Sequence, residues 1–300
     1  MAKVMVVGSI NSDLVVQVER YPHAGETLNG SELAWFPGGK GANQAVAASR
    51  LGAKVTMVGA VGRDFYGDEL IHSLQLNLVD ISYVKRTSGA SGAAIITVEQ
   101  NGENRIILSQ GANKYVTLVN PEELDGIDWL VVQNEIPWSV TEAAIKLAHE
   151  RGVKVLVNPA PAAFIPHNLY PLVDVLVVNE VEAMEIIGAK ADELSEEDTA
   201  RKLVSLGAKA VLLTLGARGS LYVTQDKVLR IPAYPVKNIV DTTAAGDTFI
   251  GGFIAGVTAG KAIEEALQFA TAASAVAISR LGAQVSIPTK GEVEAFIQKQ

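Results

Sequence analysis

The sequence predicts an α/β fold: a three-layer αβα sandwich around a mainly parallel central sheet, with a small β-sheet lid beside it. From about residue 126 onward, short runs rich in Val and Leu alternate with helical patterns. Strands that are apolar throughout are typical of parallel sheets covered by helices on both faces. Hydrophobic residues make up 48% of the 300 residues, enough for a large buried core.

The first 110 residues contain the patterns that predict the lid. A buried strand at 4–8 is followed by strand-like stretches at 14–21 and 27–36, which lie too close together for a crossover helix and so predict an antiparallel ribbon. A helix at 45–51, a strand at 54–60 and a helix at 64–76 follow. Strands at 91–98 and 105–109 flank Asn101-Gly102, a dipeptide typical of tight hairpins. We expect this hairpin to join the ribbon, so that segments 13–36 and 91–109 form the lid.

The rest of the chain predicts alternating strands and helices, then a helical end. The strands are expected at 129–132, 153–157, 175–178 and 210–215, and the helices at 139–150, 180–187, 196–206, 261–280 and 290–297. The chain has no Pro/Ser-rich linker and no internal repeat. Residues 1–300 are therefore expected to form a single domain that includes the lid.

Charge and composition exclude several classes of function. The chain has 25 basic and 33 acidic residues, a net charge of −8, and no basic run, so nucleic acid and membrane surfaces are not expected partners. It has no cysteine, which excludes disulfides, a thiol nucleophile and a Cys-based zinc site. No apolar run approaches the ~20 residues of a membrane span. We expect a soluble, cytoplasmic protein.

The stretch from Asp241 to Phe249 predicts a site for phosphoryl transfer. The small residues Ala244, Ala245 and Gly246 lead into an apolar helix, and a helix start leaves amide groups free to bind an anion such as phosphate. Asp247 at the same turn is suited to take a proton from an attacking hydroxyl. The alternative is an ordinary first-turn aspartate favoured by the helix dipole.

Two further segments predict binding of a polyol. Asn11 and Asp13 follow the first strand, where open α/β sheets bind ligands, although an Asx turn also explains them. Gly38-Gly39-Lys40-Gly41-Ala42-Asn43-Gln44-Ala45 leads into a second helix, and its glycines allow close approach of a ligand. Neither G-x-x-x-x-G-K-[ST] nor G-x-G-x-x-G is present, so these are not the usual nucleotide loops.

Polar groups near three later strand ends complete the predicted site. Asn179 is a candidate phosphate ligand, and Glu182 is a candidate to hold a Mg²⁺-bound water, since Mg²⁺ needs only one or two carboxylates. Glu135 adds an acceptor for sugar hydroxyls. The loop Thr214-Leu215-Gly216-Ala217-Arg218-Gly219 suits a nucleotide, and a plain hairpin turn explains it equally well.

Both glycine-containing motifs resemble the signatures of a known family, the PfkB (ribokinase-like) carbohydrate kinases. Gly38 to Ala45 is similar to the family's amino-terminal signature and Asp241 to Phe249 to its carboxy-terminal signature. Within the family, Gly8-Ser9-Ile10-Asn11-Ser12-Asp13 and Asn158-Pro159-Ala160-Pro161-Ala162 are most similar to the members that act on D-ribose. The resemblance covers essentially the whole chain and implies ATP-dependent phosphorylation of D-ribose at its 5-hydroxyl.

The resemblance also implies a role for each matching residue. It makes Asp247 the base and the backbone of Ala244, Ala245 and Gly246 the anion hole. The implied sugar ligands are Asn11, Asp13, Gly39, Lys40, Asn43 and Glu135. The implied ATP contacts are Asn179, Thr214 to Gly219, Gly246 and Thr271, with Glu182 ordering Mg²⁺. A K⁺ ion is implied at Asp241, Thr243, Ala277, Arg280, Gly282 and Ser286, several of them through backbone carbonyls. Pairing of family members through the lid implies a homodimer.

Two other interpretations stay open at this point. One is a kinase for 2-deoxyribose, a nucleoside or another sugar, with the same chemistry. The other is a regulator that only binds sugar or nucleotide, which Asp247 beside Gly246 disfavours because a pure binder has no use for a base there.

Overall fold

A nine-stranded sheet forms the centre of the computed structural model, which describes residues 2–100, 103–117, 120–162, 164–189 and 193–300. From β11 to β5, every neighbouring pair of its strands is parallel, and the two strands at the other edge continue it antiparallel. The spatial order is β13 (Val228–Ile231), β12 (Ser220–Thr224), β11 (Ala210–Thr214), β10 (Val175–Asn179), β9 (Lys154–Val157), β8 (Trp129–Val132), β1 (Lys3–Val7), β4 (Lys54–Gly62) and β5 (Asp80–Thr87).

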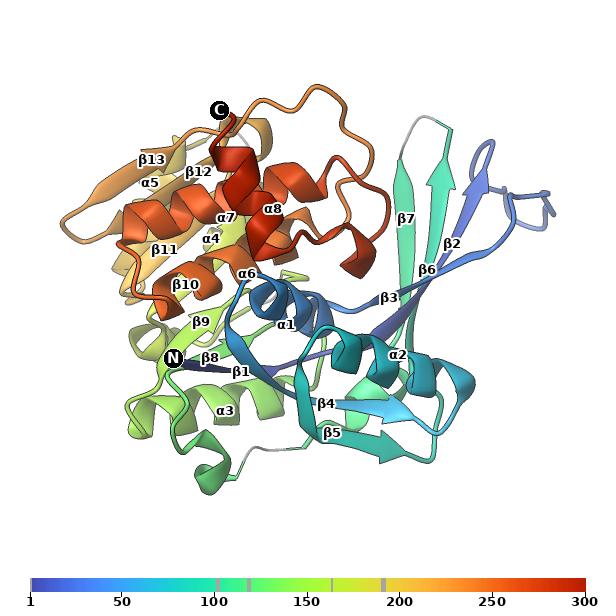
Figure 1. The fold of residues 1–300 in the computed structure, drawn as a ribbon, viewed down its shortest axis with the longest axis horizontal. Helices are drawn as coiled ribbons and strands as arrows, with labels where there is room; N and C mark the ends of the chain where they lie inside the picture. The colour runs from blue at the N-terminus through green and yellow to red at the C-terminus, as the bar shows by residue number, and fades with distance from the viewer. Residues whose placement is uncertain (1, 101–102, 118–119, 163, 190–192) are drawn as a thin grey trace.

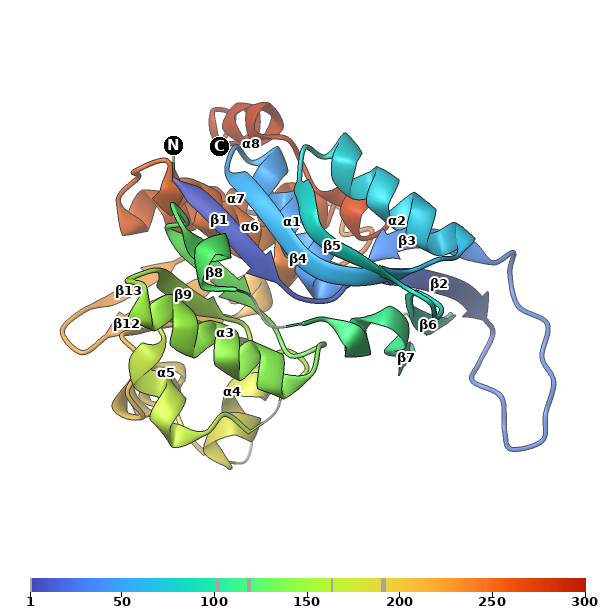
Figure 2. The same ribbon diagram turned by 90° about the horizontal axis from the view of Figure 1, so that it is seen from below.

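Helices cover both faces of this sheet, as Figure 2 shows. One layer holds α1 (Lys40–Arg50), α2 (Phe65–Leu76), α6 (Ala245–Thr258), α7 (Ile263–Ala277) and α8 (Lys290–Ile297); the other holds α3 (Trp138–Glu150), α4 (Glu180–Ile187) and α5 (Glu196–Ser205). Successive residues of a strand point to opposite faces, so Met5 packs into one apolar cluster and Val6 into the other. The predicted three-layer αβα sandwich is confirmed.

A second, four-stranded sheet stands beside the sandwich (Figure 1). Its order is β3 (Ala34–Gly38), β2 (Asn11–Val18), β6 (Gly92–Glu99) and β7 (Asn104–Ser109), with β2 antiparallel to β3 and parallel to β6. The early ribbon and the later hairpin therefore share one sheet, as predicted; the Asn101-Gly102 turn lies outside the described residues. Because β2 starts shortly after β1 ends, one short segment joins the two sheets at Asn11.

Several predicted boundaries were wrong. The second ribbon strand covers only Ala34–Gly38, because most of residues 19–33 form an exposed loop, closed in part by an ion pair between Arg20 and Glu26. Helix α1 begins at Lys40 rather than 45, and the edge strands β5, β12 and β13 were not predicted. Short 3-10 turns complete the fold: η1 (Gly111–Tyr115), η2 (Pro121–Leu124), η3 (His167–Leu172), η4 (Gly216–Arg218) and η5 (Gln284–Ser286). Across the described residues, no helix is both long and apolar enough to span a bilayer.

Helices α1 and α6 touch almost backbone to backbone. A Cβ on Gly251 would lie 2.3 Å from the Cβ of Ala47 and 2.6 Å from the backbone nitrogen of Ala48. Real Cβ atoms do not approach so closely, so only glycine fits at this crossing. The contact brings the start of α1, with its polar side chains, against the start of α6.

Candidate active site

Polar residues follow adjacent parallel strands along one edge of the large sheet. Gln133 follows β8, Asn158 follows β9, Asn179 ends β10 and Thr214 ends β11, while Ser9 lies just beyond β1. The carboxyl ends of parallel strands share one edge, which is where open α/β sheets bind their ligands. The starts of α1 and α6 face this same edge, as the hydrogen bonds described below show.

Asp247 lies at the centre of this group, in the first turn of α6 and only 7% exposed. Both of its carboxylate oxygens accept a hydrogen bond from a side-chain amide of α1: Oδ2 from Asn43 Nδ2 at 3.0 Å and Oδ1 from Gln44 Nε2 at 2.9 Å. Such amide donors favour a carboxylate oriented in one plane. The site thus holds a buried carboxylate in a fixed orientation.

The turn that precedes Asp247 has the shape of an anion site. Ala244, the N-cap of α6, has φ 58° and ψ 13°, a left-handed conformation rare for a residue with a Cβ. Ala245 N donates to the Thr242 carbonyl at 3.1 Å, which closes the turn. Gly246 follows, and a Cβ built on it would meet no atom within 4 Å. Open space therefore lies directly over the positive end of α6.

A small cavity of about 230 Å³ extends from this turn. It joins the α6 turn to residues at the ends of β9, β10 and β11, and Lys40 and Asp247 both line it. The lining residues are Lys40, Asn158, Ala160, Val177, Val178, Asn179, Glu182, Thr214, Thr242, Ala244, Ala245, Gly246, Asp247 and Ile250. The predicted phosphate-side residues Asn179, Glu182 and Thr214 are thus brought together with Asp247.

A second group of charges lies on the β2 side of Asp247. Burial first, and then the charges of Glu135 and Asp247, raise the pKa of Asp13 to about 7. Burial likewise raises the pKa of Glu135. Burial acts to lower the pKa of Lys40, but the carboxylates around it, Asp247 foremost, outweigh burial and raise it. Four acids, Asp247, Glu135, Glu182 and Asp13, therefore act on the charge of Lys40.

Backbone and side-chain contacts hold the polar groups of this neighbourhood in place. Glu135 Oε2 accepts hydrogen bonds from Ser9 Oγ at 2.6 Å and from the Lys40 backbone nitrogen at 3.1 Å. Asn113 Nδ2 donates to Asn11 Oδ1 at 2.6 Å. Gly39 has φ 89°, and a Cβ there would lie 2.7 Å from the Asn11 backbone nitrogen, so glycine is needed for this approach. Predicted sugar ligands from β2, α1 and the β8 end lie around Asp247.

The predicted nucleotide loop lies only partly at the cavity. Thr214 lines it, Leu215 is buried and Gly219, at φ 90°, closes the antiparallel β11–β12 connection. Gly216 and Ala217 are exposed on η4. Arg218 pairs with Glu180 and Glu196 beside a separate cavity of about 750 Å³ between α4 and α5.

Thr271 does not line the cavity beside Asp247. It is buried on α7, and its Oγ1 donates to the Leu267 carbonyl at 2.8 Å. Its predicted contact with ATP stays a prediction.

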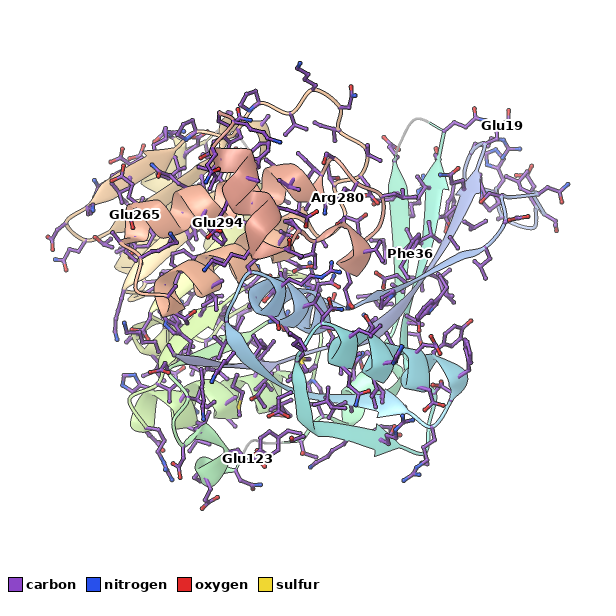
Figure 3. The ribbon with its side chains drawn as sticks, viewed as in Figure 1. Glu19, Phe36, Glu123, Glu265, Arg280 and Glu294 are labelled. Carbon is purple, nitrogen blue, oxygen red and sulfur yellow. The ribbon has the colours of Figure 1, made fainter. Side chains whose placement is uncertain are left out.

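Asp241 links the segments predicted to hold K⁺. Its Oδ1 accepts from the Thr243 backbone nitrogen and Oγ1, and its Oδ2 from the Gly282 backbone nitrogen at 2.9 Å. Arg280 directs its guanidinium to Glu292, so only its backbone is available to a cation. Figure 3 shows Arg280 on the turn after α7; two residues further on, a Cβ built on Gly282 would lie 3.2 Å from the Phe36 ring of β3. Ala277 ends α7 and Ser286 ends η5, both buried.

Sequence reasoning missed several polar residues that support the site. Gln44, Asn158 and Gln133 form a buried amide chain that reaches Asp247, and Asn113 and Ser9 hold Asn11 and Glu135. The available signal was position: Gln44 follows Asn43 in the glycine-rich motif, and three of the others follow predicted strands.

A buried carboxylate between an open helix start and buried polar side chains such as Asp13, Asn43 and Glu135 is the arrangement expected of a phosphotransferase that acts on a hydroxyl group. The chain belongs to the PfkB family of carbohydrate kinases: the family model matches residues 1–290.

Known relatives match the chain over nearly its full length. It is 39% identical to a ribokinase of Staphylococcus aureus (97% of this chain, 98% of the relative) and 34% identical to a deoxyribokinase of Salmonella typhi (98% of each). Among solved structures, a ribokinase of Thermotoga maritima superposes with TM-score 0.91 at 38% identity (99% of this chain, 100% of that one). A ribokinase of Arabidopsis thaliana, complexed with ribose and ATP, gives TM-score 0.92 at 32% identity, covering 99% of each chain.

Proposed function

We propose that this chain transfers the γ-phosphoryl group of ATP to the 5-hydroxyl of D-ribose. The observation that carries the proposal is the position of Asp247. It lines the cavity beside the α6 turn and also accepts a hydrogen bond from Asn43, one of the predicted sugar ligands. The ribokinase relatives at 38–39% identity, with deoxyribokinases at 34%, favour ribose over its 2-deoxy analogue.

Each group in the site has a part in the proposed transfer. The 5-oxygen of the sugar attacks the γ-phosphorus, Asp247 accepts the proton of that hydroxyl, and ADP leaves with the electrons of the broken P–O bond. The amides at the α6 turn would bind the oxygens of the migrating phosphoryl group. Lys40, which lines the cavity beside Asp247, would add positive charge there.

Unpaired acceptors around Asp247 favour a ligand rich in hydroxyl groups. Within the part of the chain that the structure describes, Asn43 Oδ1 is buried without a hydrogen-bond partner. A buried acceptor of this kind costs free energy until a donor binds it. Sugar hydroxyls would supply donors to Asn43, Asp13, Asn11 and Glu135. A site that pairs hydroxyls in this way discriminates strongly against analogues that lack one.

The residues present fit the two cations that the family implies. Among the described residues, Glu182 and Asp247 are the carboxylates that line the cavity, and Mg²⁺ is commonly held by one or two carboxylates, waters and phosphate oxygens. When bound, Mg²⁺ would neutralise charge on the ATP phosphates. Asp241 Oδ2 accepts a single hydrogen bond from Gly282 and so retains capacity for a monovalent cation.

The proposal is tested by a coupled assay of ADP release with D-ribose, 2-deoxyribose, fructose and adenosine as acceptors. We expect the highest kcat/KM with D-ribose. A higher value for one of the other acceptors would reassign the substrate within the family, and ATP binding without turnover of any acceptor would favour a regulator.

Replacing K⁺ by tetramethylammonium in the same assay is expected to lower turnover. Tetramethylammonium is too large to take the place of K⁺ beside Asp241. Because Asp241 and Ala244 lie in the same turn before α6, loss of K⁺ is expected to disturb the proposed anion site. Equal rates in the two salts would remove the cation site from the proposal. Na⁺ at matched ionic strength serves as the control for a general salt effect.

The pKa of Asp13 predicts a pH-dependent affinity for sugar. A pKa of about 7 in the folded protein, against 3.8 for the free side chain, means that Asp13 binds a proton as pH falls below 7. Ionised Asp13 is the better acceptor for sugar hydroxyls, so the sugar KM should rise by up to about tenfold per pH unit below that point.

The same group gives a stability effect of opposite sense. The folded state binds the proton more tightly than the unfolded state, so this group's contribution to stability falls as pH rises from about 4 to 7. Measuring the sugar KM from pH ~5.5 to ~8, with Asp13→Asn as the control, checks the prediction of pH-dependent sugar affinity. A pH-independent KM in the wild-type chain would contradict it.

We also propose that two copies pair through the four-stranded sheet, which would act as a lid. Ile95, Ile106, Ile107 and Leu108 on β6 and β7 are 45–59% exposed, and every residue of the edge strand β7 is exposed. Exposed apolar edge strands commonly mark interaction surfaces. Sedimentation of the chain with and without sugar would measure the pairing.

A further inference from the structure

Two successive side chains of α1 hold the carboxylate of Asp247, but only one of them can meet a ligand. Asn43 is 5% exposed and has an unpaired Oδ1, whereas Gln44 is 1% exposed and its amide is bound on both ends by the protein. Gln44 Nε2 donates to Asp247 Oδ1 at 2.9 Å and to Asn158 Oδ1 at 3.1 Å, and Gln44 Oε1 accepts from Gln133 Nε2 at 2.6 Å. Gln44 is therefore no substrate ligand.

A chain of fixed amides sets the orientation of Gln44. Asn158 Nδ2 donates to the Val177 carbonyl at 3.0 Å, which turns Asn158 Oδ1 toward Gln44. Because Asn158 Oδ1 and the Asp247 carboxylate are both acceptors, Gln44 must turn its Nε2 toward them. Gln133 Nε2 then donates to Gln44 Oε1 on the opposite side. An inverted Gln44 amide would set oxygen against two oxygens and nitrogen against nitrogen, which is costly for buried groups.

We propose that Gln44 is a positioning residue for the proton transfer: it holds the Asp247 carboxylate in the plane from which that carboxylate meets the sugar hydroxyl. The inference rests on the proposed function of Asp247 as the base. With Oδ1 held by Gln44 and Oδ2 by Asn43, two acceptor positions of the carboxylate are used, and about two of four stay available. Without Gln44, one oxygen loses its donor and the carboxylate can rotate about its Cβ–Cγ bond.

The test is a double-mutant cycle of Gln44→Met and Asp247→Asn. Methionine is similar in length and helix propensity but has no amide, so it removes the donor and keeps most of the packing volume. In the wild-type background we expect Gln44→Met to lower kcat by about 10- to 10²-fold, the usual cost of a misplaced catalytic group. The sugar KM, and the Kd for D-ribose from calorimetry, should change less than about threefold because Gln44 does not contact the sugar.

The Asp247→Asn background separates positioning from a general structural role. There Gln44→Met is expected to change kcat by less than about twofold, because no base is left to orient. Similar losses in both backgrounds, or a matching loss of ribose affinity, would show that Gln44 only supports the fold. Ser49→Ala is the matched control: it removes a hydrogen bond of the same helix, from Ser49 Oγ to the Asn77 carbonyl, and should leave kcat unchanged.

A second variant keeps the inference testable if Gln44→Met does not fold. Among the described residues, the Gln133 side-chain amide bonds only to Gln44 Oε1, so Gln133→Leu loosens Gln44 without touching Asp247. We expect a smaller fall in kcat, again at unchanged ribose Kd and again absent in the Asp247→Asn background. Near-normal turnover of Asp247→Asn itself would overturn the base assignment and this inference together. A slow Asp247→Asn beside a normal Gln44→Met and Gln133→Leu would overturn this inference alone.

Discussion

Replacing Asp247 by asparagine is expected to lower kcat by at least ~10²-fold, the usual contribution of a general base. Asparagine keeps the size of the side chain but cannot accept the proton of the sugar hydroxyl. It also turns one N–H₂ donor toward Asn43 or Gln44, which each donate to a carboxylate oxygen in the wild-type chain. Calorimetry should show D-ribose binding that is largely retained, because the other predicted sugar ligands are unchanged.

The control for this prediction is another aspartate at the same helical position. Asp198 is the third residue of α5, as Asp247 is of α6, but it is exposed and caps with Ser195. Asp198→Asn should cost only the dipole and capping interaction, about 0.3–1 kcal/mol of stability, and leave turnover unchanged. If Asp247 were merely a first-turn residue, the two variants would behave alike. Turnover of Asp247→Asn near the wild-type value would remove it from the role of base.

The second large effect is expected from Gly246→Ala, which should stabilise the fold while it impairs catalysis. The new Cβ meets no protein atom within 4 Å, and alanine in place of glycine in a helix gains about 0.5–1 kcal/mol. However, the methyl group would stand in the space over the α6 start, where the proposed function places the migrating phosphoryl group against the amides. We expect kcat/KM for ATP to fall by about 10²-fold, the order of losing one such donor.

The chain offers a closely matched glycine as the control for Gly246. Gly291 is the second residue of α8, as Gly246 is of α6, and a Cβ built on it also meets nothing within 4 Å. Gly291→Ala should give a similar gain in the free energy of unfolding with normal kinetics. Thermal unfolding and steady-state kinetics of both variants check the prediction. Unchanged kinetics of Gly246→Ala would place the phosphoryl group away from this turn.

The fold class could be predicted because the central strands are almost pure Val and Leu between helical patterns. The strands that were missed lie at the edges of the large sheet: β5 contains charged residues that face solvent, and β12 and β13 continue the sheet antiparallel. Periodicity is weak for such strands. Helix α1 was predicted to start late because Gly41 in its first turn lowers helix propensity, and a close approach to Ser9 requires glycine there.

The site residues at helix starts and strand ends could be predicted from the sequence, but the hydrogen-bond network that supports them could not. Asp247, Lys40 and Asn179 stand at helix starts or strand ends that local sequence reveals, and the structure brings them to one cavity. The amide chain through Gln44, Asn158 and Gln133 joins residues up to 114 positions apart, and no local pattern indicates which buried amides will meet. Arg218, predicted as an ATP contact from its glycine loop, lies on the 3-10 turn η4 and pairs with Glu180 and Glu196, and its contact with ATP stays a prediction.

The close crossing of α1 and α6 fixes how far the Asp247 carboxylate lies from the side-chain amides of Asn43 and Gln44 that hold it. Gly251 packs against the methyl group of Ala47 and the backbone of Ala48, so no long, flexible side chain can absorb a change in bulk at this crossing. Substitutions at these positions are therefore coupled. A larger residue at position 251 requires a smaller one on α1, and Ala47 can lose only its methyl group. On the proposed function, the rate of the chemical step is therefore expected to depend on Gly251, Ala47 and Ala48, none of which lines the cavity beside Asp247.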